Sequence, residues 1–252
     1  MNATKSFDLT GRTALVTGSS RGIGHAIAMA LGRAGAMVIF HGVKMSDALR
    51  QTLADARAAG IGCAAVTGDL GDEKAVARIA EECDGKADIL VLNASAQQYT
   101  YIDSFDCVEF EREVNANLRS AFLMLKAFLP PMRQRRWGRV INVGSVNQTR
   151  PAARLSVYSA TKAALQNLMD CAAKEYAADG ITVNSIVPGI ICTDRNRQIL
   201  SDPQWRPKLQ AMVPAGRFGT PEDCAGAVLM LSSDAASYVT GASIPIAGGM
   251  QL

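Results

Sequence analysis

The sequence predicts a single α/β domain in which a doubly wound, parallel, seven-stranded sheet carries helices on both faces. Short apolar runs of strand length alternate with stretches of helical periodicity, which is typical of βαβ units with right-handed crossovers. The length of 252 residues lies within the range of one large α/β domain. Because no linker, repeat or low-complexity tract divides the chain, we expect residues 1–252 to form one unit.

The first half of the chain predicts four strands with three helices between them. The strands are expected at residues 13–17, 37–41, 64–66 and 89–92. The fourth is apolar throughout, as a strand covered on both faces should be. The helices are expected at residues 23–34, 46–60 and 72–83. Gly35 ends the first of these helices, and Ser46 can cap the second.

The second half begins with a long helical stretch whose apolar side chains recur every three or four residues. These side chains are Phe110, Val114, Leu118, Phe122 and Leu125. Pro130–Pro131 is expected to end or kink this helix, because proline lacks the N–H that a helix interior needs. Strands are expected at residues 140–143, 182–187 and 243–246, and helices at residues 157–178 and from Pro221, which fits a first helical turn.

The charge balance argues against nucleic acid as the main partner. With 26 basic and 23 acidic residues the net charge is +3, which is too balanced for a polyanion-binding chain. The densest basic run surrounds Trp137, and we interpret it as a solvated helix end rather than a phosphate-binding patch. It consists of Arg133, Arg135, Arg136 and Arg139.

Targeting and cysteine patterns favour a soluble cytoplasmic protein. No apolar run approaches the roughly 18 residues needed to span a membrane, and residues 1–11 lack the apolar stretch of a secretory signal. The six cysteines form no C-x-x-C pair, and only two histidines accompany them, so we expect no metal site. Scattered cysteines of this kind are expected to be buried thiols in a reducing compartment.

Residues 17–24, Thr-Gly-Ser-Ser-Arg-Gly-Ile-Gly, lie between the first strand and the first helix. Glycines at this place permit a tight turn and let backbone N–H groups approach a pyrophosphate at the N-terminus of the helix. The spacing differs from the commoner G-x-G-x-x-G fingerprint, so a purely structural turn is the alternative. The position directly after the first strand favours the nucleotide-binding interpretation.

Tyr158 and Lys162 form a second motif on the helix expected at residues 157–178. Residues four apart share one helical face, so the phenol and the ammonium group can lie close together. A nearby cation stabilises phenolate and makes tyrosine a better acid–base group at neutral pH. Ser145, at the end of the fifth strand, is placed to hydrogen-bond a substrate oxygen.

Together these motifs resemble the short-chain dehydrogenase/reductase family, and the resemblance extends from Thr13 to the C-terminus. It implies a Rossmann-type fold that binds a nicotinamide dinucleotide. Asn93-Ala94-Ser95 is similar to the family's N-A-G motif, with Ser95 in place of Gly. The cofactor contacts that the resemblance implies are Gly18, Ser20, Arg21, Gly22, Ile23, Gly24, Asp69, Leu70, Asn93, Ala94, Tyr158, Lys162, Pro188, Gly189 and Thr193.

The catalytic set that the resemblance implies is Asn117, Ser145, Tyr158 and Lys162. In the reducing direction Tyr158 would donate a proton to a carbonyl oxygen that Ser145 holds, while hydride passes between the nicotinamide and the carbonyl carbon. Lys162 would lower the Tyr158 pKa and contact the nicotinamide ribose. Asn117 would organise the water that resupplies the proton. The activity implied is NAD(P)-dependent interconversion of a carbonyl and a secondary alcohol.

Substrate identity is expected to depend on residues 190–219, which the resemblance identifies as a mobile lid. This stretch and the loop after Ser145 carry the arginines 195, 197, 206, 217, 150 and 154. They favour a small polar substrate such as a sugar, polyol or hydroxy acid, although most of them are expected to be surface residues.

Two other functions stay open. The first is reduction of 3-oxoacyl groups on acyl carrier protein, whose reductases usually present basic residues to the acidic carrier. Arg136 fits one of those positions, but Asp179 does not fit the other. The second is a catalytically silent nucleotide-binding sensor, which would have no need to keep all four catalytic residues.

NADP(H) is expected to be preferred, with NAD(H) as the alternative. An NAD-selective site needs a carboxylate at the end of the second strand, and that position is Gly42. Arg21 and Lys44 are available as cationic partners for a 2′-phosphate, whereas Val43 occupies a position where NADP-using relatives often carry Arg. The resemblance also implies a homotetramer, in which the helices at residues 110–128 and 157–178 form the larger interface and the C-terminal segment the other.

Overall fold

The computed structural model describes residues 6–252, and its centre is one parallel seven-stranded sheet with the strand order β3-β2-β1-β4-β5-β6-β7. The strands are β1 (Thr13–Val16), β2 (Met37–Gly42), β3 (Cys63–Thr67), β4 (Ile89–Leu92), β5 (Gly138–Val143), β6 (Ile181–Pro188) and β7 (Ser243–Ile246). All seven predicted strands are confirmed. The strand order reverses between β1 and β4, which is where ligands bind in open α/β sheets.

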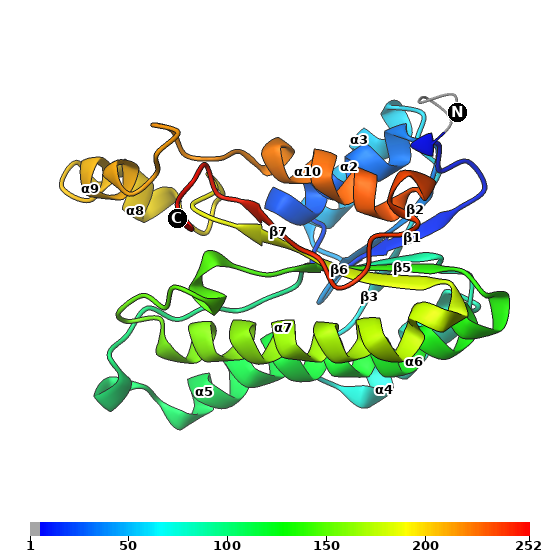
Figure 1. The fold of residues 1–252 in the computed structure, drawn as a ribbon, viewed down its shortest axis with the longest axis horizontal. Helices are drawn as coiled ribbons and strands as arrows, with labels where there is room; N and C mark the ends of the chain where they lie inside the picture. The colour runs from blue at the N-terminus through cyan, green and yellow to red at the C-terminus, as the bar shows by residue number, and fades with distance from the viewer. Residues whose placement is uncertain (1–5) are drawn as a thin grey trace.

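Helices cover both faces of this sheet, as predicted (Figure 1). On one face lie α2 (Gly22–Arg33), α3 (Asp47–Ala58) and α10 (Pro221–Ser232), and on the other lie α4 (Glu73–Glu82), α5 (Cys107–Val114), α6 (Ser120–Arg135) and α7 (Ser156–Tyr176). Two short helices, α8 (Arg197–Ser201) and α9 (Arg206–Ala211), project from one end of the molecule. Short 3-10 turns η1 (Ile102–Ser104), η3 (Val146–Gln148), η4 (Ala177–Asp179) and η5 (Asp234–Ala236) complete the connections.

Each face of the sheet has its own hydrophobic core. Phe40 and Ile27 belong to the core beneath α2, α3 and α10, while Leu15 and Phe128 belong to the core beneath α4, α6 and α7. Successive side chains of one strand point to opposite faces of the sheet and therefore belong to opposite cores. This burial fixes the register of the sheet and with it the positions of the loops at its carboxyl edge.

The helix expected around residues 110–128 is interrupted by a π-helical turn, η2 (Asn115–Arg119), between α5 and α6. The π turn changes which side chains face the sheet. Leu125 is buried, but Phe110 and Phe122 are 45% and 51% exposed. The apolar repeat that predicts this helix therefore lies partly on the surface of the chain.

The helix does not end at the two prolines. Pro130 and Pro131 lie inside α6, which continues to Arg135. The flanking side chains of Leu129 and Met132 are buried against the sheet. Their burial holds the last turn in place despite the hydrogen bonds that proline cannot donate.

Two expectations about side-chain exposure are partly wrong. Arg139 is buried, stacks 4.3 Å from the Trp137 ring centroid and pairs with Asp234 at 3.3 Å, whereas the other three arginines of the run are exposed. The expectation of buried thiols holds for Cys83 and Cys224 but is wrong for cysteines 107, 171 and 192, which are exposed. A sequence pattern does not reveal these differences because they depend on neighbours brought in by the fold.

In residues 6–252 no helix is both long enough and apolar enough to cross a membrane. In the same part of the chain, no three side chains of the metal-binding types gather into a group that could hold an ion.

Candidate active site

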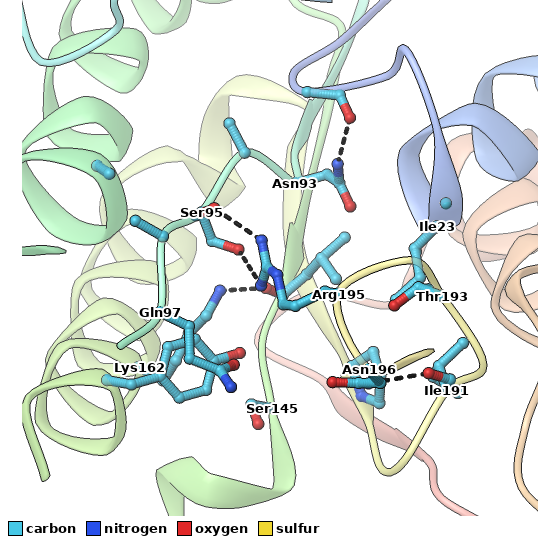
Figure 2. Close-up of a pocket in the computed structure, with 18 of the residues that line it drawn as sticks. Ile23, Asn93, Ser95, Gln97, Ser145, Lys162, Ile191, Thr193, Arg195 and Asn196 are labelled. Atoms are coloured by element: carbon cyan, nitrogen blue, oxygen red, sulfur yellow. Dashed lines mark hydrogen bonds between the residues drawn. The ribbon is translucent and has the colours of Figure 1, made fainter. Parts of the chain in front are cut away.

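A cavity of about 860 Å³ opens at the carboxyl edge of the sheet. Its walls come from the Gly-rich turn after β1, the ends of β2 to β6, the first part of α7 and the segment after β6 (Figure 2). Nearly all of the predicted site residues line this cavity. The two exceptions are Gly24 and Asn117, which lie behind its walls.

The Gly-rich turn has the geometry that a diphosphate needs. Gly18 and Gly22 adopt φ values of +61° and +60°, a region in which side chains are strained. A Cβ at Gly24 would collide with Asn93 Nδ2 and the Gly18 carbonyl, so only glycine permits this approach. Helix α2 begins here without a side-chain N-cap and without an acidic residue in its first turn. Its free N–H groups and positive helix end therefore fit the diphosphate of a dinucleotide.

The turn is held by groups from the neighbouring strands. Thr17 Oγ accepts hydrogen bonds from the backbone N–H groups of Asn93 at 2.9 Å and Ala94 at 3.0 Å. Asn93 Nδ2 donates in return to the Thr17 carbonyl at 2.8 Å. The Asn93 side chain therefore supports the turn, and Asn93 and Ala94 both line the cavity.

His41, at the end of β2, is a site residue that sequence reasoning missed. Its Nδ1 accepts a hydrogen bond from the Gly18 N–H at 3.1 Å, and its Nε2 lies 3.0 Å from the Gly68 carbonyl. Burial lowers the pKa of His41, which favours the neutral ring that this pair of contacts requires. His41 thus connects the Gly-rich turn to the end of β3. The sequence feature that could have indicated this role is the position of His41 at a strand end, next to Gly42.

The predicted cofactor contacts after β3 and after β6 line the same cavity. Asp69 Oδ1 accepts the Gly71 N–H at 2.9 Å, and Leu70 lies beside it in the cavity wall. Gly189 packs so closely on the strand-β7 side that an added Cβ would lie 3.0 Å from Ala247 Cα. Thr193 lies opposite the start of α2, 3.5 Å from the place of a Cβ at Gly22.

Tyr158, Lys162 and Ser145 line the same cavity, in which Figure 2 shows Ser145 and Lys162. Lys162 Nζ lies 5.8 Å from the centroid of the Tyr158 ring. All three are buried, and Lys162 Nζ donates to the Val143 carbonyl at 2.7 Å. Ser145 caps the 3-10 turn after β5 by accepting the Asn147 N–H at 3.2 Å. The motif spacing on α7 therefore places phenol and ammonium on one wall, as expected from i, i+4 residues on a helix, and the Ser145 hydroxyl reaches the same cavity from the turn after β5.

The charges at this wall shift both titratable groups. Burial raises the pKa of Tyr158, while the positive charge of Arg195 and hydrogen bonding from Ser145 lower it. Burial, reinforced by Arg195, lowers the pKa of Lys162 from 10.5 to about 7. The positive charge of Arg195 therefore acts on both Tyr158 and Lys162.

Asn117 lies in the π turn η2 and is almost fully buried. Its Oδ1 accepts the Ala96 N–H at 2.7 Å, and its Nδ2 donates to the Ala96 carbonyl at 2.9 Å and to Thr161 Oγ at 3.0 Å. These bonds tie the segment after β4 to α7. The water-holding role implied for Asn117 stays a prediction.

Glu113 is a second residue that sequence reasoning missed. Its carboxyl group is inaccessible to solvent, one oxygen accepts the Gln98 N–H, and the other has no hydrogen-bond partner. Burial raises the Glu113 pKa, and the charge of Arg195 lowers it. A lone Glu in an amphipathic helix carries no sequence signal for this burial, because a π turn and the loop after β4 create it.

Comparison with known proteins agrees with this geometry. The family described as enoyl-(acyl carrier protein) reductase matches residues 18–251. A 3-oxoacyl-[acyl-carrier-protein] reductase of Pseudomonas aeruginosa is 40% identical over 97% of this chain and 99% of its own length. The chain belongs to the short-chain dehydrogenase/reductase family. It is thus similar to NAD(P)-dependent oxidoreductases that act on carbonyl and alcohol groups.

Other members of the short-chain dehydrogenase/reductase family are equally extensive matches. An L-rhamnose 1-dehydrogenase (NAD(P)(+)) of a Sphingomonas species is 36% identical over 96% of this chain and 97% of its own length. A crystal structure of gluconate 5-dehydrogenase from Burkholderia cenocepacia, in complex with NADP and tartrate, superposes with a TM-score of 0.94. It is 30% identical and covers 99% of this chain and 98% of its own.

Proposed function

We propose that this family member is an NADP(H)-dependent oxidoreductase that interconverts the carbonyl and secondary alcohol of a small polar molecule. The observation that carries the proposal is the placement of Tyr158, Lys162 and Ser145 on the cavity wall, in the same cavity as the Gly-rich turn at the start of α2. A nicotinamide dinucleotide, when bound, supplies or accepts the hydride.

The protein's own residues manage the proton and the geometry. Tyr158 donates its hydroxyl proton to the carbonyl oxygen during reduction and takes it back during oxidation. Ser145, held by its cap on η3, positions the same oxygen by a hydrogen bond. Lys162, bonded to the Val143 carbonyl, retains N–H donors for the ribose of the cofactor. Asn117 holds the segment that borders this wall and organises the water that resupplies the proton.

The end of β2 supports a preference for NADP(H) over NAD(H). Gly42 and Arg21 line the cavity, and Gly42 offers no carboxylate that would repel a 2′-phosphate. Arg21 forms no ion pair within residues 6–252, so its guanidinium is available to the phosphate. Lys44 lies outside the cavity lining and is assigned no role.

The ratio of kcat/KM for NADP and NAD tests this preference. Wild type should favour NADP, and Arg21→Ala should reduce the ratio by about tenfold or more, because one charge-assisted phosphate contact is lost. Gly42→Asp should move the ratio further toward NAD. Wild type that favours NAD, together with no effect of Arg21→Ala, would show that this assignment of strand β2 is wrong.

Reduction of 3-oxoacyl groups on acyl carrier protein is the second candidate, and the 40% identical relative favours it. The surface charge supports it in part. Arg136 and Arg133 share one carboxylate, that of Asp179, at 3.0 and 2.6 Å, so Asp179 offsets only one of two exposed positive charges where a carrier would dock. An acidic carrier would meet a weakly basic surface at this place.

Oxidation of NADPH separates the candidates. The enzyme should turn over small oxo sugars or oxo acids with a higher kcat/KM than a 3-oxoacyl group on acyl carrier protein. If the carrier substrate is preferred, and if Arg136→Glu weakens its kcat/KM but not that of a free thioester, the carrier function replaces this proposal. No turnover with any carbonyl or alcohol would favour the silent sensor.

We propose a homotetramer in the cytoplasm as the working form of the enzyme. The exposed apolar side chains on α5 and α6, Val108, Phe110 and Phe122, support an interface along these helices. Light scattering at micromolar concentration should give about four times the chain mass of 26.7 kDa. A 26.7 kDa particle would contradict the tetramer.

A further inference from the structure

Arg195, in the lid segment after β6, makes an unusual contact across the cavity. Its two terminal nitrogens donate to Ser95 Oγ at 3.0 Å and to the Ser95 carbonyl at 2.7 Å. Figure 2 shows the side chain extending over the pocket from the Thr193 side to Ser95. Ser95 stands where the family motif has Gly, so the hydroxyl that receives Arg195 is a departure from that motif.

The guanidinium of Arg195 has no carboxylate partner among the ion pairs of residues 6–252. The other lid arginines are engaged elsewhere: Arg197 pairs with Asp194, Arg217 pairs with Asp223, and Arg206 stacks 5.5 Å from the Phe218 ring centroid. Of these four arginines, only Arg195 lines the cavity. The lid therefore delivers one unneutralised positive charge to the pocket.

This charge lies near the reacting groups. It lowers the pKa of Tyr158 and of Lys162, so its field reaches the wall where the carbonyl oxygen would lie. Glu113 also feels the charge, but its carboxyl accepts the Gln98 N–H and is sealed from solvent. An anion that enters the cavity would thus find Arg195 still able to bind it.

The donor geometry defines the class of anion. After its two bonds to Ser95, the guanidinium keeps Nε–H and one N–H on each terminal nitrogen. A planar fork of this kind matches a carboxylate. Ser95 holds the fork in place, so less side-chain entropy is lost when the anion binds.

We propose that Arg195, positioned by Ser95, binds the carboxylate of a hydroxy acid or oxo acid whose reacting carbon lies at Tyr158. This inference rests on the oxidoreductase function proposed above and narrows its substrate to anionic molecules. Arg195 is then a specificity-determining residue, and Ser95 is a positioning residue. A neutral sugar or polyol would leave the positive charge unmatched.

The test compares matched probes that differ only in the anionic group. D-gluconate, L-tartrate and glycerate are assayed beside sorbitol, threitol and glycerol for NADP reduction, and the corresponding oxo compounds for NADPH oxidation. In wild type at least one acid should exceed its neutral partner in kcat/KM by tenfold or more. Arg195→Met should lower kcat/KM for that acid by about 100-fold, the loss typical of a charge-assisted pair. The loss for the neutral partner should be at least tenfold smaller, because that substrate reports only the effect of Arg195 on Tyr158 and Lys162.

Three further variants test whether the preference for acids depends on the guanidinium of Arg195 and on its contact with Ser95. Arg195→Lys should recover part of the activity on the acid, because it restores charge without the fork. Ser95→Gly should raise KM for the acid more than it lowers kcat. Arg197→Gln, a lid arginine already paired with Asp194, serves as the matched control and should stay near wild type.

Binding of NADPH, followed by fluorescence, separates the substrate from the cofactor as the source of the anion. The affinity of Arg195→Met for NADPH should equal that of wild type. A weakened NADPH affinity with no change in the preference for acids would assign Arg195 to the cofactor diphosphate and overturn the proposal. Turnover of neutral carbonyls alone would also overturn it but would leave the oxidoreductase function intact. Absence of turnover with every probe and with a broader panel of carbonyl compounds would overturn both the role of Arg195 and the proposed oxidoreductase function.

Discussion

Replacement of Lys162 is expected to increase the stability of the protein and to decrease its turnover. The Lys162 ammonium group is buried, and within residues 6–252 its one hydrogen bond is the 2.7 Å bond to the Val143 carbonyl. In the folded chain Lys162 loses its proton near pH 7, compared with 10.5 for an exposed lysine. That difference corresponds to about 5 kcal/mol by which burial disfavours the charged form.

The pH dependence follows from proton linkage. Between the folded pKa of about 7 and the unfolded value of 10.5, the unfolded chain binds more protons than the folded chain. Stability therefore rises with pH across this window, and the full cost of burying the charge is present only below pH 7. The cost is about 5 kcal/mol near pH 6.5 and about 2 kcal/mol near pH 9.

Replacing Lys162 with Met removes this cost and also removes the bond to Val143, which costs about 1 kcal/mol at any pH. The cofactor-free Lys162→Met variant should therefore melt at a higher temperature than wild type near pH 6.5. The gain in Tm should shrink by roughly 5 to 10 °C near pH 9, at about 2 to 4 °C per kcal/mol for a chain of this size. Turnover should fall sharply at both pH values.

Differential scanning fluorimetry of the two proteins at both pH values measures the effect. Lys174→Met, an exposed lysine near the end of the same helix, is the control and should show no pH-dependent difference. A Tm difference for Lys162→Met that is the same at both pH values would refute the reasoning, because it would mean that Lys162 keeps its proton in the folded chain as it does in the unfolded chain.

Three other expected outcomes follow from the site. Tyr158→Phe removes only the hydroxyl, so kcat should fall by about 100-fold or more while NADPH affinity measured by fluorescence stays unchanged; near-normal turnover would exclude Tyr158 as the general acid. The raised Glu113 pKa means that the folded wild-type chain loses stability as pH rises above 4.5. Glu113→Gln should therefore raise Tm by an amount that grows with pH, whereas replacement of the exposed Glu111 by Gln should give no such pH-dependent gain in Tm. Thr17→Val leaves two backbone N–H groups without their acceptor, so urea unfolding should show a loss of about 2 to 4 kcal/mol; a neutral result would mean that water replaces the hydroxyl.

The strand assignments show how much local pattern alone can predict. The predicted ranges of β4 and β7 coincide with the observed strands, and the others differ by one or two residues at their ends. Parallel strands covered on both faces are continuously apolar, so their signal is local. The motif at Tyr158 and Lys162 could also be recognised from the sequence, because helical spacing alone puts the two side chains on one face.

The errors arise where tertiary contacts override a local rule. Pro130 and Pro131 should end a helix by themselves, but burial of Leu129 and Met132 keeps α6 intact. Arg139 is buried because Trp137, two residues away, stacks on it and Asp234, from a distant part of the chain, pairs with it. The pairing with Asp234 cannot be recognised from the basic run in which Arg139 lies.

The sequence by itself determined the doubly wound sheet, the diphosphate turn and the Ser145–Tyr158–Lys162 wall, because each depends on residue type and short-range spacing. Only the tertiary structure decided which of the lid arginines faces the cavity, since that depends on Ser95, about 100 residues away in sequence. It also decided the directions in which the pKa values of Lys162 and Glu113 shift, because a pKa depends on burial and on neighbouring charges in space. Specificity depends on such long-range contacts, whereas fold and reaction class depend on local ones.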